Sequence, residues 1–407
     1  KNSRPLNRLI IVKGIKNSFI RKVAVYVTPN RESLPTLVGR LVYMDKRYLG
    51  DLQLKKELRH PKVKLALFGL GRAGTIHLAN ILSSPRVKLM YAVDDVESRW
   101  ADLKEYWHLD DVVLLNSRQS DRVYNDMNVD AVIVATPTHT HEAIVRRALE
   151  ANKAVFCEKP ISEDFANAIK CYDTARKIGK PLFCAFNRRF DPSYSSVRER
   201  VRKGDVGHVH VIKTVSRDSP LPSLEYLKIS GGIFRDCIVH DLDIITWTLG
   251  EYPVKVAVQA HAHIPEIKAI GDYDTVVISL YFPSGTLGIV DISRNSSFGY
   301  DQRLEVFGPK GMITADNERP IHGVAAQQGH QGGGSAPIWY SFASRFINGY
   351  RRELDHFLDV VLGEAESSVL PKETLAVCKI TSACEESART GKMVEIKWLP
   401  KELPVSV

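Results

Sequence analysis

With 407 residues, of which 44% are hydrophobic and 25% charged, the chain has a globular composition and is too long for one core, so we expect two domains. No apolar run approaches the roughly 20 residues that a membrane helix needs, so no membrane partner is expected. The net charge is +9, but residues 1–62 alone carry +11, from 15 Lys and Arg against four acids. The remaining 41 basic and 43 acidic residues give −2, so the folded body has no basic excess for binding nucleic acid.

Residues 1–61 are interpreted as a basic N-terminal extension. They are rich in Arg and Lys, and Glu32 is the only acid among residues 1–44, a composition typical of organelle-targeting segments. A disordered tail or an error of gene prediction would show the same composition, so these alternatives stay open. We expect a cytoplasmic protein, or a mitochondrial one if the extension is a targeting segment.

Residues 62–186 alternate short apolar runs with amphipathic stretches. This alternation predicts an α/β domain of the Rossmann kind, a doubly wound parallel sheet covered by helices on both faces. The predicted strands are Val63–Phe68, Val87–Val93, Val112–Leu115, Asp130–Ala135, Lys153–Cys157 and Pro181–Ala185. The predicted helices are Ala73–Leu82, Asp121–Met127, Thr140–Ala151 and Ser162–Ile178.

Residues 187–398 follow a different pattern, in which apolar residues recur with a period of two. This predicts an α+β domain with a largely antiparallel, open sheet, and residues 399–407 are left as a tail. The predicted strands are His208–Val215, Val254–Ala262, Thr275–Phe282, Thr286–Ser293 and Gln302–Phe307. The predicted helices are Tyr194–Lys203, Asp236–Leu249, Tyr340–Leu362 and Lys372–Thr390, with a loop at Gln327–Pro337.

A glycine-rich turn joins the first predicted strand to the first predicted helix. Gly69, Gly71 and Gly74 follow the G-x-G-x-x-G spacing, which permits a tight turn, close approach of a pyrophosphate and close helix–strand packing. The N-terminus of the following helix offers free N–H groups to that anion. The turn therefore predicts a dinucleotide site.

The end of the second strand carries two acids, Asp94 and Asp95. A carboxylate here accepts hydrogen bonds from the adenosine ribose and repels a 2′-phosphate, which favours NAD over NADP. Arg72, inside the glycine turn, could instead pair with a 2′-phosphate. We expect NAD, with NADP as the lesser alternative.

Lys159 and a helical acid/imidazole stripe are the candidate catalytic groups. Lys159 ends the fifth strand, at the sheet edge that faces the ligand crevice, and Pro160 keeps it extended. Asp236, His240 and Asp243 fall on one stripe of the helix after Gly231-Gly232. A carboxylate one turn from an imidazole can fix its tautomer and support proton uptake, which alcohol oxidation requires, although such a pair can also be structural. The six cysteines lack a C-x-x-C pair, so no zinc site or disulfide framework is expected. The acid/His/acid stripe could also bind a metal, but no further cluster completes such a site, so no metal is expected.

These features together resemble the Gfo/Idh/MocA oxidoreductases and, among them, the inositol 2-dehydrogenases. The resemblance covers about residues 62–398. The segments that carry it are GLGRAG at 69–74, AVDDV at 92–96, ATPTHTH at 135–141, FCEKP at 156–160, FNRRFDPS at 186–193, SRDSPLPSLEYLKISGG at 216–232, DCIVHDLD at 236–243 and FGYDQRLEVFGPKGM at 298–312.

The resemblance assigns roles to residues that spacing alone does not. It implies that His240 takes the hydroxyl proton with support from Asp236, and that Lys159 polarises the reacting oxygen. It implies cofactor contacts from the glycine turn, with Arg72 and Ala73, from Asp95, and from the segments that follow the fourth and fifth strands. In those segments the cofactor residues are Thr136, Pro137, His141 and Glu158, and the implied substrate residues are Asp218, Asp243 and Tyr300.

The implied activity is NAD-dependent oxidation of a cyclitol hydroxyl to a ketone, with myo-inositol converted to 2-keto-myo-inositol. Another cyclitol, an aldose or a keto-sugar is the alternative substrate, and a non-catalytic NAD-binding sensor is the alternative class. The resemblance also implies a homotetramer that packs through the open face of the second sheet.

Overall fold

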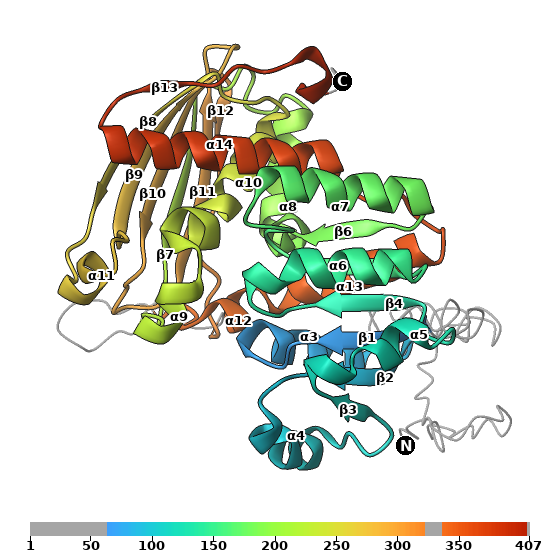
Figure 1. Cartoon of the computed structure of the whole chain (residues 1–407). Helices are drawn as coiled ribbons and strands as arrows, with labels where there is room; N and C mark the ends of the chain where they lie inside the picture. The colour runs from blue at the N-terminus through green and yellow to red at the C-terminus, as the bar shows by residue number, and fades with distance from the viewer. Residues whose placement is uncertain (1–62, 322–335, 405–407) are drawn as a thin grey trace, which may run out of the picture. The chain divides into compact units, whose positions relative to one another are not determined.

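The computed structural model describes residues 63–321 and 336–404 (Figure 1). The predictions for the N-terminal extension, and most of the predicted Gln327–Pro337 loop, lie outside these residues. None of the described helices is long and apolar enough to cross a membrane.

A six-stranded parallel sheet forms the first domain, in the order β3-β2-β1-β4-β5-β6. This order confirms the predicted Rossmann fold, whose ligand crevice lies at the carboxyl ends of the strands. Buried Val, Ile, Leu and Ala fill the central strands because helices cover both faces. The strands are β1 (Val63–Phe68), β2 (Val87–Val93), β3 (Val113–Leu115), β4 (Ala131–Val134), β5 (Ala154–Glu158) and β6 (Leu182–Ala185).

The helices of the first domain begin and end at recognisable capping residues. The Asp164 side chain accepts a hydrogen bond from the Asn167 N–H at the start of α7, and Gly179 ends that helix in the left-handed region. The helix predicted from Ser162 therefore starts three residues later. The helices are α3 (Arg72–Ser83), α4 (Trp100–Trp107), α5 (Asp121–Asn125), α6 (His141–Glu150) and α7 (Phe165–Ile178).

A seven-stranded sheet forms the second domain, in the order β12-β11-β7-β10-β9-β8-β13. All neighbours are antiparallel except β7 and β10, which confirms a largely antiparallel sheet. The strands are β7 (Val211–Arg217), β8 (Lys255–His261), β9 (Thr275–Tyr281), β10 (Leu287–Ser293), β11 (Asp301–Gly308), β12 (Gly311–Ala315) and β13 (Val394–Glu395).

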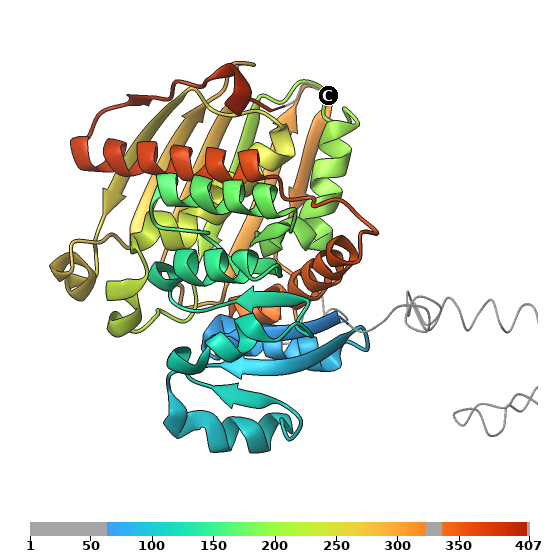
Figure 2. The ribbon, with the colours of Figure 1, turned by 45° about the vertical axis from the view of Figure 1, so that its right-hand side comes forward.

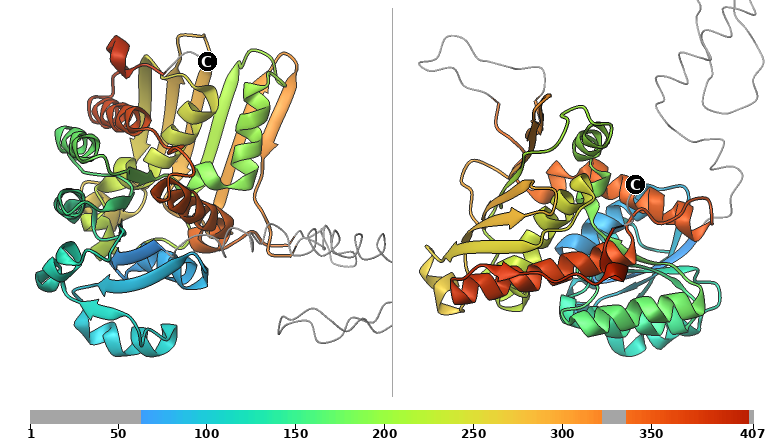
Figure 3. Two further views of the ribbon diagram at one scale, coloured as in Figure 1. Left: turned by 90° about the vertical axis from the view of Figure 1, so that its right-hand side faces the viewer. Right: turned by 90° about the horizontal axis from the view of Figure 1, so that it is seen from above.

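Helices cover one face of this sheet, and α14 runs across it beside α7 of the first domain (Figures 2 and 3). The opposite face presents exposed apolar side chains. Val277, Leu287, Phe307 and Met312 are 42–57% exposed, and their strand registers place them on the same side. The remaining helices are α8 (Pro192–Arg202), α9 (Leu224–Ile229), α10 (Val239–Leu249), α11 (Pro265–Ala269), α12 (Phe342–Arg345), α13 (Ile347–Val361) and α14 (Pro371–Thr390).

Two predicted helices differ from the observed ones. The helix predicted from Asp236 begins with a π-helical turn, Phe234–Ile238, before α10. The helix predicted over Tyr340–Leu362 is divided into α12 and α13. Although α13 lies in the second segment of the sequence, it packs on α3, and Phe357 contacts Phe156 of β5 with ring centroids 5.4 Å apart. The first domain is thus completed by a helix from the end of the chain.

Candidate active site

The glycine turn between β1 and α3 is tightly packed on one side and open on the other. Gly69 has a φ of +90°, and a Cβ on it would lie 2.4 Å from the Ala135 carbonyl oxygen. A Cβ on Gly74 would lie 2.0 Å from the Gly69 carbonyl oxygen, so both positions require glycine. A Cβ on Gly71 would meet nothing within 4 Å. The turn therefore leaves its Gly71 side open for a ligand.

The N-terminus of α3 is suited to an anion. Its N-cap is Gly71, which provides no side-chain hydrogen bond, and the first turn has no acidic residue. The first N–H groups, including those of Arg72 and Ala73, therefore have no side-chain cap to compete with a pyrophosphate. The residues present fit the pyrophosphate of a dinucleotide.

The two acids after β2, Asp94 and Asp95, make different contacts. Asp94 accepts the Leu70 N–H at 2.7 Å through one oxygen and the Val96 N–H at 2.9 Å through the other, so it fixes the glycine turn. Asp95 is exposed and accepts the Ser117 N–H at 2.7 Å through Oδ1. Asp95, the acid that the resemblance assigns to the ribose, is thus the exposed carboxylate of the two.

The loops after β4 and β5 are joined by His141. Its Nδ1 lies 2.8 Å from the Pro160 carbonyl oxygen and its Nε2 lies 2.9 Å from that of Thr136. The ring is buried, and burial lowers its pKa. Thr136, with Pro137 after it, is further held by a 2.7 Å hydrogen bond between the Thr136 and Thr140 hydroxyls. His141 therefore positions these loops and has no ring nitrogen left for a ligand.

Glu158 supports the neighbouring lysine from inside the protein. One carboxylate oxygen lies 2.7 Å from His77 Nε2, and the other accepts the Lys159 N–H at 3.3 Å. Burial raises the pKa of Glu158, but the hydrogen bond and charge of His77, with Lys159 nearby, bring it below its usual value. Glu158 is therefore a charged support for the end of β5.

Lys159 reaches from the first domain to the second. Its Nζ donates to the Asp236 carbonyl oxygen at 2.6 Å and lies 3.5 Å from Asp236 Oδ1. The side chains are only 14% and 13% exposed, so the pair is screened little by water. The bond between Lys159 and Pro160 is cis. The predicted lysine and aspartate thus come together where the two domains meet.

Two residues that the sequence did not single out hold Asp236. The Tyr226 hydroxyl donates to Oδ1 at 2.8 Å, and Arg294 Nη1 donates to Oδ2 at 3.0 Å. Arg294 is fully buried and also donates to Asp272 at 3.3 Å. Burial raises the pKa of Asp236, but Lys159, Arg294 and Tyr226 together bring it below its usual value. Asp236 is therefore an anion fixed on three sides.

His240 occupies the same region but is not bonded to Asp236. Its Nδ1 is buried and has no hydrogen-bond partner in the described part of the chain. Burial, with the charges of Lys159 and Arg188, sets its pKa well below 6.5, so the imidazole is neutral at pH 7. The π-turn that contains Asp236 alters the helical spacing that predicted an Asp236–His240 pair. Asp236 supports Lys159 here, in place of the predicted support of the imidazole.

The predicted substrate residues divide into two kinds. Asp218 is partly buried and accepts from Cys237 Sγ at 3.3 Å, and its pKa is raised by burial and by the charge of Asp236. Tyr300 is 6% exposed, and burial raises its pKa. Asp243, by contrast, is fully buried, and both of its oxygens accept from Arg189. This ion pair gives Asp243 a structural role in place of the predicted substrate contact.

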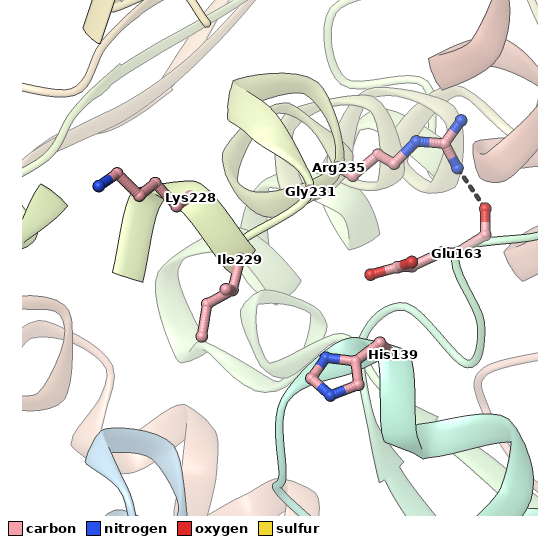
Figure 4. A pocket seen from close by; sticks show the side chains of 6 residues that line it. All are labelled: His139, Glu163, Lys228, Ile229, Gly231 and Arg235. Atoms are coloured by element: carbon pink, nitrogen blue, oxygen red, sulfur yellow. Dashed lines mark hydrogen bonds between the residues drawn. The ribbon is translucent and has the colours of Figure 1, made fainter. Parts of the chain in front are cut away.

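A pocket of about 320 Å³ is lined by residues close in sequence to Lys159 and Asp236, and not by these two residues or His240 (Figure 4). Glu163 of the pocket follows Lys159 by four residues, and Arg235 directly precedes Asp236. Arg235 donates to the Glu163 carbonyl oxygen, which joins the segment after β5 to the π-turn. The pocket therefore borders both segments that carry the catalytic candidates. Its lining residues are His139, Glu163, Lys228, Ile229, Gly231 and Arg235.

No group of three or more His, Cys, Asp or Glu side chains that could hold a metal ion occurs within residues 63–321 and 336–404.

The dinucleotide-binding turn and the interdomain lysine and imidazole define an oxidoreductase. Residues 63–186 match the oxidoreductase family with an NAD-binding Rossmann fold, and residues 194–314 match the GFO/IDH/MocA C-terminal domain. The chain belongs to this family and is an NAD-dependent oxidoreductase.

Known relatives share nearly the whole described chain. The myo-inositol 2-dehydrogenase of Thermotoga maritima is 35% identical over 82% of this chain and 99% of its own length. The inositol 2-dehydrogenase of Rhizobium meliloti is 32% identical over 82% of this chain and 99% of its own. The crystal structure of scyllo-inositol dehydrogenase from Lactobacillus casei, with bound NAD(H) and scyllo-inositol, matches with a TM-score of 0.75 at 25% identity, covering 82% of this chain and 99% of that one.

Proposed function

We propose that this protein oxidises a ring hydroxyl of a cyclitol to a ketone with NAD, and that myo-inositol is its substrate and 2-keto-myo-inositol its product. The observation that carries the proposal is the meeting of Lys159, from the first domain, with Asp236 and a neutral His240 from the second. The similarity to inositol dehydrogenases that act on the myo and scyllo isomers supports a cyclitol as the substrate class.

His240 is the general base of the proposed reaction. Alcohol oxidation requires a group that accepts the hydroxyl proton, and an imidazole held neutral by burial can do so at pH 7. Lys159 donates a hydrogen bond to the reacting oxygen and stabilises its developing negative charge. Asp236 keeps the ammonium in place, since it binds Nζ through its carbonyl oxygen and lies beside it through Oδ1.

Residues of the first domain hold the cofactor. The N-terminus of α3 would hold the pyrophosphate, and Asp95 would accept hydrogen bonds from the ribose. Thr136 and Pro137 follow β4, where the nicotinamide half would bind. Bound NAD supplies the hydride acceptor. The Arg72 guanidinium lies 4.1 Å from the centroid of the Tyr226 ring, so it is directed toward the second domain and away from a 2′-phosphate beside Asp95. We therefore favour NAD over NADP.

Asp218 and Tyr300 are the proposed substrate contacts. Both are close enough to Arg188 for its charge to lower their pKa values against the effect of burial. A polyol needs several hydrogen-bonding groups of this kind, because buried polar groups reject substrates that lack the matching hydroxyl.

A second copy of the chain is the proposed occupant of the open sheet face. Val277, Leu287, Phe307 and Met312 are exposed apolar side chains on it, and a self-complementary sheet face forms a symmetric interface. We propose that the protein forms a homotetramer.

A substrate panel tests the activity. Purified protein with NAD or NADP is offered myo-inositol, scyllo-inositol and several aldoses, and NADH formation is followed by absorbance. We expect turnover with NAD and a cyclitol, fastest with myo-inositol. Turnover with aldoses and not with cyclitols would show that the substrate is a sugar. Tight NAD binding without turnover of any compound would indicate a non-catalytic sensor.

A further inference from the structure

Tyr226 stands between the coenzyme turn and the catalytic carboxylate. It lies in the short helix α9, whose N-cap Ser223 accepts the Tyr226 N–H at 3.3 Å and so fixes the start of the helix. The ring is partly buried, and burial and the charge of Asp236 raise the pKa of Tyr226, so its hydroxyl stays protonated. The phenol therefore remains a donor at every working pH.

The two ends of this side chain make different contacts. The hydroxyl donates to Asp236 Oδ1 at 2.8 Å, and that oxygen lies 3.5 Å from Lys159 Nζ. The ring face receives the Arg72 guanidinium at 4.1 Å, a distance at which a cation is attracted to an aromatic ring. Arg72 is the first residue of α3 and directly follows Gly71. A single side chain thus spans the coenzyme turn and the catalytic pair.

We propose that Tyr226 is a positioning residue for the reaction, which couples the coenzyme-binding turn to the catalytic pair by seating Arg72 on its ring and fixing Asp236 with its hydroxyl. This inference rests on the proposed dehydrogenase function. Because the two contacts use separate parts of the side chain, they can be removed one at a time. A purely structural tyrosine would instead affect only folding.

Two substitutions separate the contacts. Tyr226→Phe keeps the ring and removes the hydrogen bond to a charged group, so kcat should fall about 10- to 100-fold while the dissociation constant for NADH stays within about twofold of the parent's. Tyr226→Leu also removes the ring, so NADH should bind about two- to fivefold more weakly than to Tyr226→Phe. NADH binding is measured by fluorescence titration and folding by thermal denaturation.

A double-mutant cycle tests the coupling. Arg72→Leu should weaken NADH binding in the parent, but by a smaller factor in the Tyr226→Leu background, because the ring that seats Arg72 is already absent. Additive effects would overturn the proposal, as would a Tyr226→Phe enzyme with the parent's kcat and pH profile. If the parent oxidises no cyclitol but the non-additive NADH binding is found, the proposed function fails while the Arg72–Tyr226 coupling stands.

Discussion

The Lys159 ammonium donates to the Asp236 carbonyl oxygen at 2.6 Å and lies 3.5 Å from the carboxylate of the same residue. Lys159 ends β5 of the Rossmann domain, whereas Asp236 lies in the π-turn before α10 of the second domain. The contact therefore exists only when the two domains are docked. Because Arg294 and Tyr226 fix the carboxylate, it can in turn hold the lysine. The chemistry of this site therefore depends on residues from three separate parts of the chain.

The pH dependence of activity should report the buried imidazole. Since burial, Lys159 and Arg188 lower the pKa of His240 well below 6.5, the base is neutral above that pH and is lost by protonation as the pH falls. We expect kcat/KM to be independent of pH near pH 7 and to fall at acid pH with a midpoint below 6.5. A midpoint above 6.5 would show that another group governs the acid limb.

Asp95 should set the preference for NAD. Replacement by Ser removes the carboxylate that accepts hydrogen bonds from the ribose, so the KM for NAD should rise about tenfold. It also removes the charge that repels a 2′-phosphate, so the ratio of kcat/KM with NAD to that with NADP should fall. Asp94→Asn is the matched control: it disturbs the bonds to Leu70 and Val96, so it should lower the melting temperature and leave the NAD/NADP ratio unchanged. An unchanged ratio in the Asp95 variant would contradict the assignment.

Arg294→Gln should affect both stability and pH dependence. The guanidinium is fully buried between Asp236 and Asp272, and its loss leaves two carboxylates without their shared cation, at a cost of about 3 kcal/mol in the free energy of unfolding. The pKa of Asp236 should rise, so a second group should lose its charge at low pH in addition to His240, and activity should fall more steeply on the acid side than in the parent. Arg294→Lys keeps the positive charge but cannot donate to both carboxylates through a planar guanidinium. Its stability and pH profile should therefore lie between those of the parent and Arg294→Gln. Parent-like denaturation and pH profiles in Arg294→Gln would contradict this role.

Phe307→Asp should dissociate the oligomer. The residue is 45% exposed on the apolar sheet face, paired with Met312 of β12, where a charge would be buried against a second copy. Sedimentation should show a smaller species than the parent. Met127→Asp, on an exposed residue of the first domain, is the control and should leave the mass unchanged. A parent-sized particle for the Phe307 variant would place the interface elsewhere.

The pattern of the sequence predicted the Rossmann sheet and its glycine turn because each rests on local signals. The alternation of strands and helices and the fixed spacing of Gly69, Gly71 and Gly74 are visible within short windows. The substrate role of Asp243 was implied by the resemblance, which gives no information about its ion pair with Arg189 from a distant 3-10 turn. The packing of α13 on α3 is likewise a long-range contact.

Arg294 could have been found from the sequence, whereas the π-turn could not. Along β10 every second residue is buried, namely Gly288, Val290 and Ile292. Arg294 is the next residue in this alternation, so it too points to the core. A charged residue in phase with buried ones indicates a buried partner. Nothing in the residue types at Phe234–Ile238 distinguishes a π-turn from an α-helix, so the separation of Asp236 from His240 needed coordinates.

The central claim is that a neutral His240, close enough to Lys159 to feel its charge, takes the proton of a cyclitol hydroxyl. The most direct measurement is single-turnover NADH formation from saturating NAD and myo-inositol, in the parent and in His240→Gln, with NAD affinity measured in both. We predict NADH formation in the parent, a rate about 10²- to 10⁴-fold lower in the variant, and equal NAD affinities. A variant as fast as the parent, or a parent that forms no NADH with any cyclitol, would contradict the account.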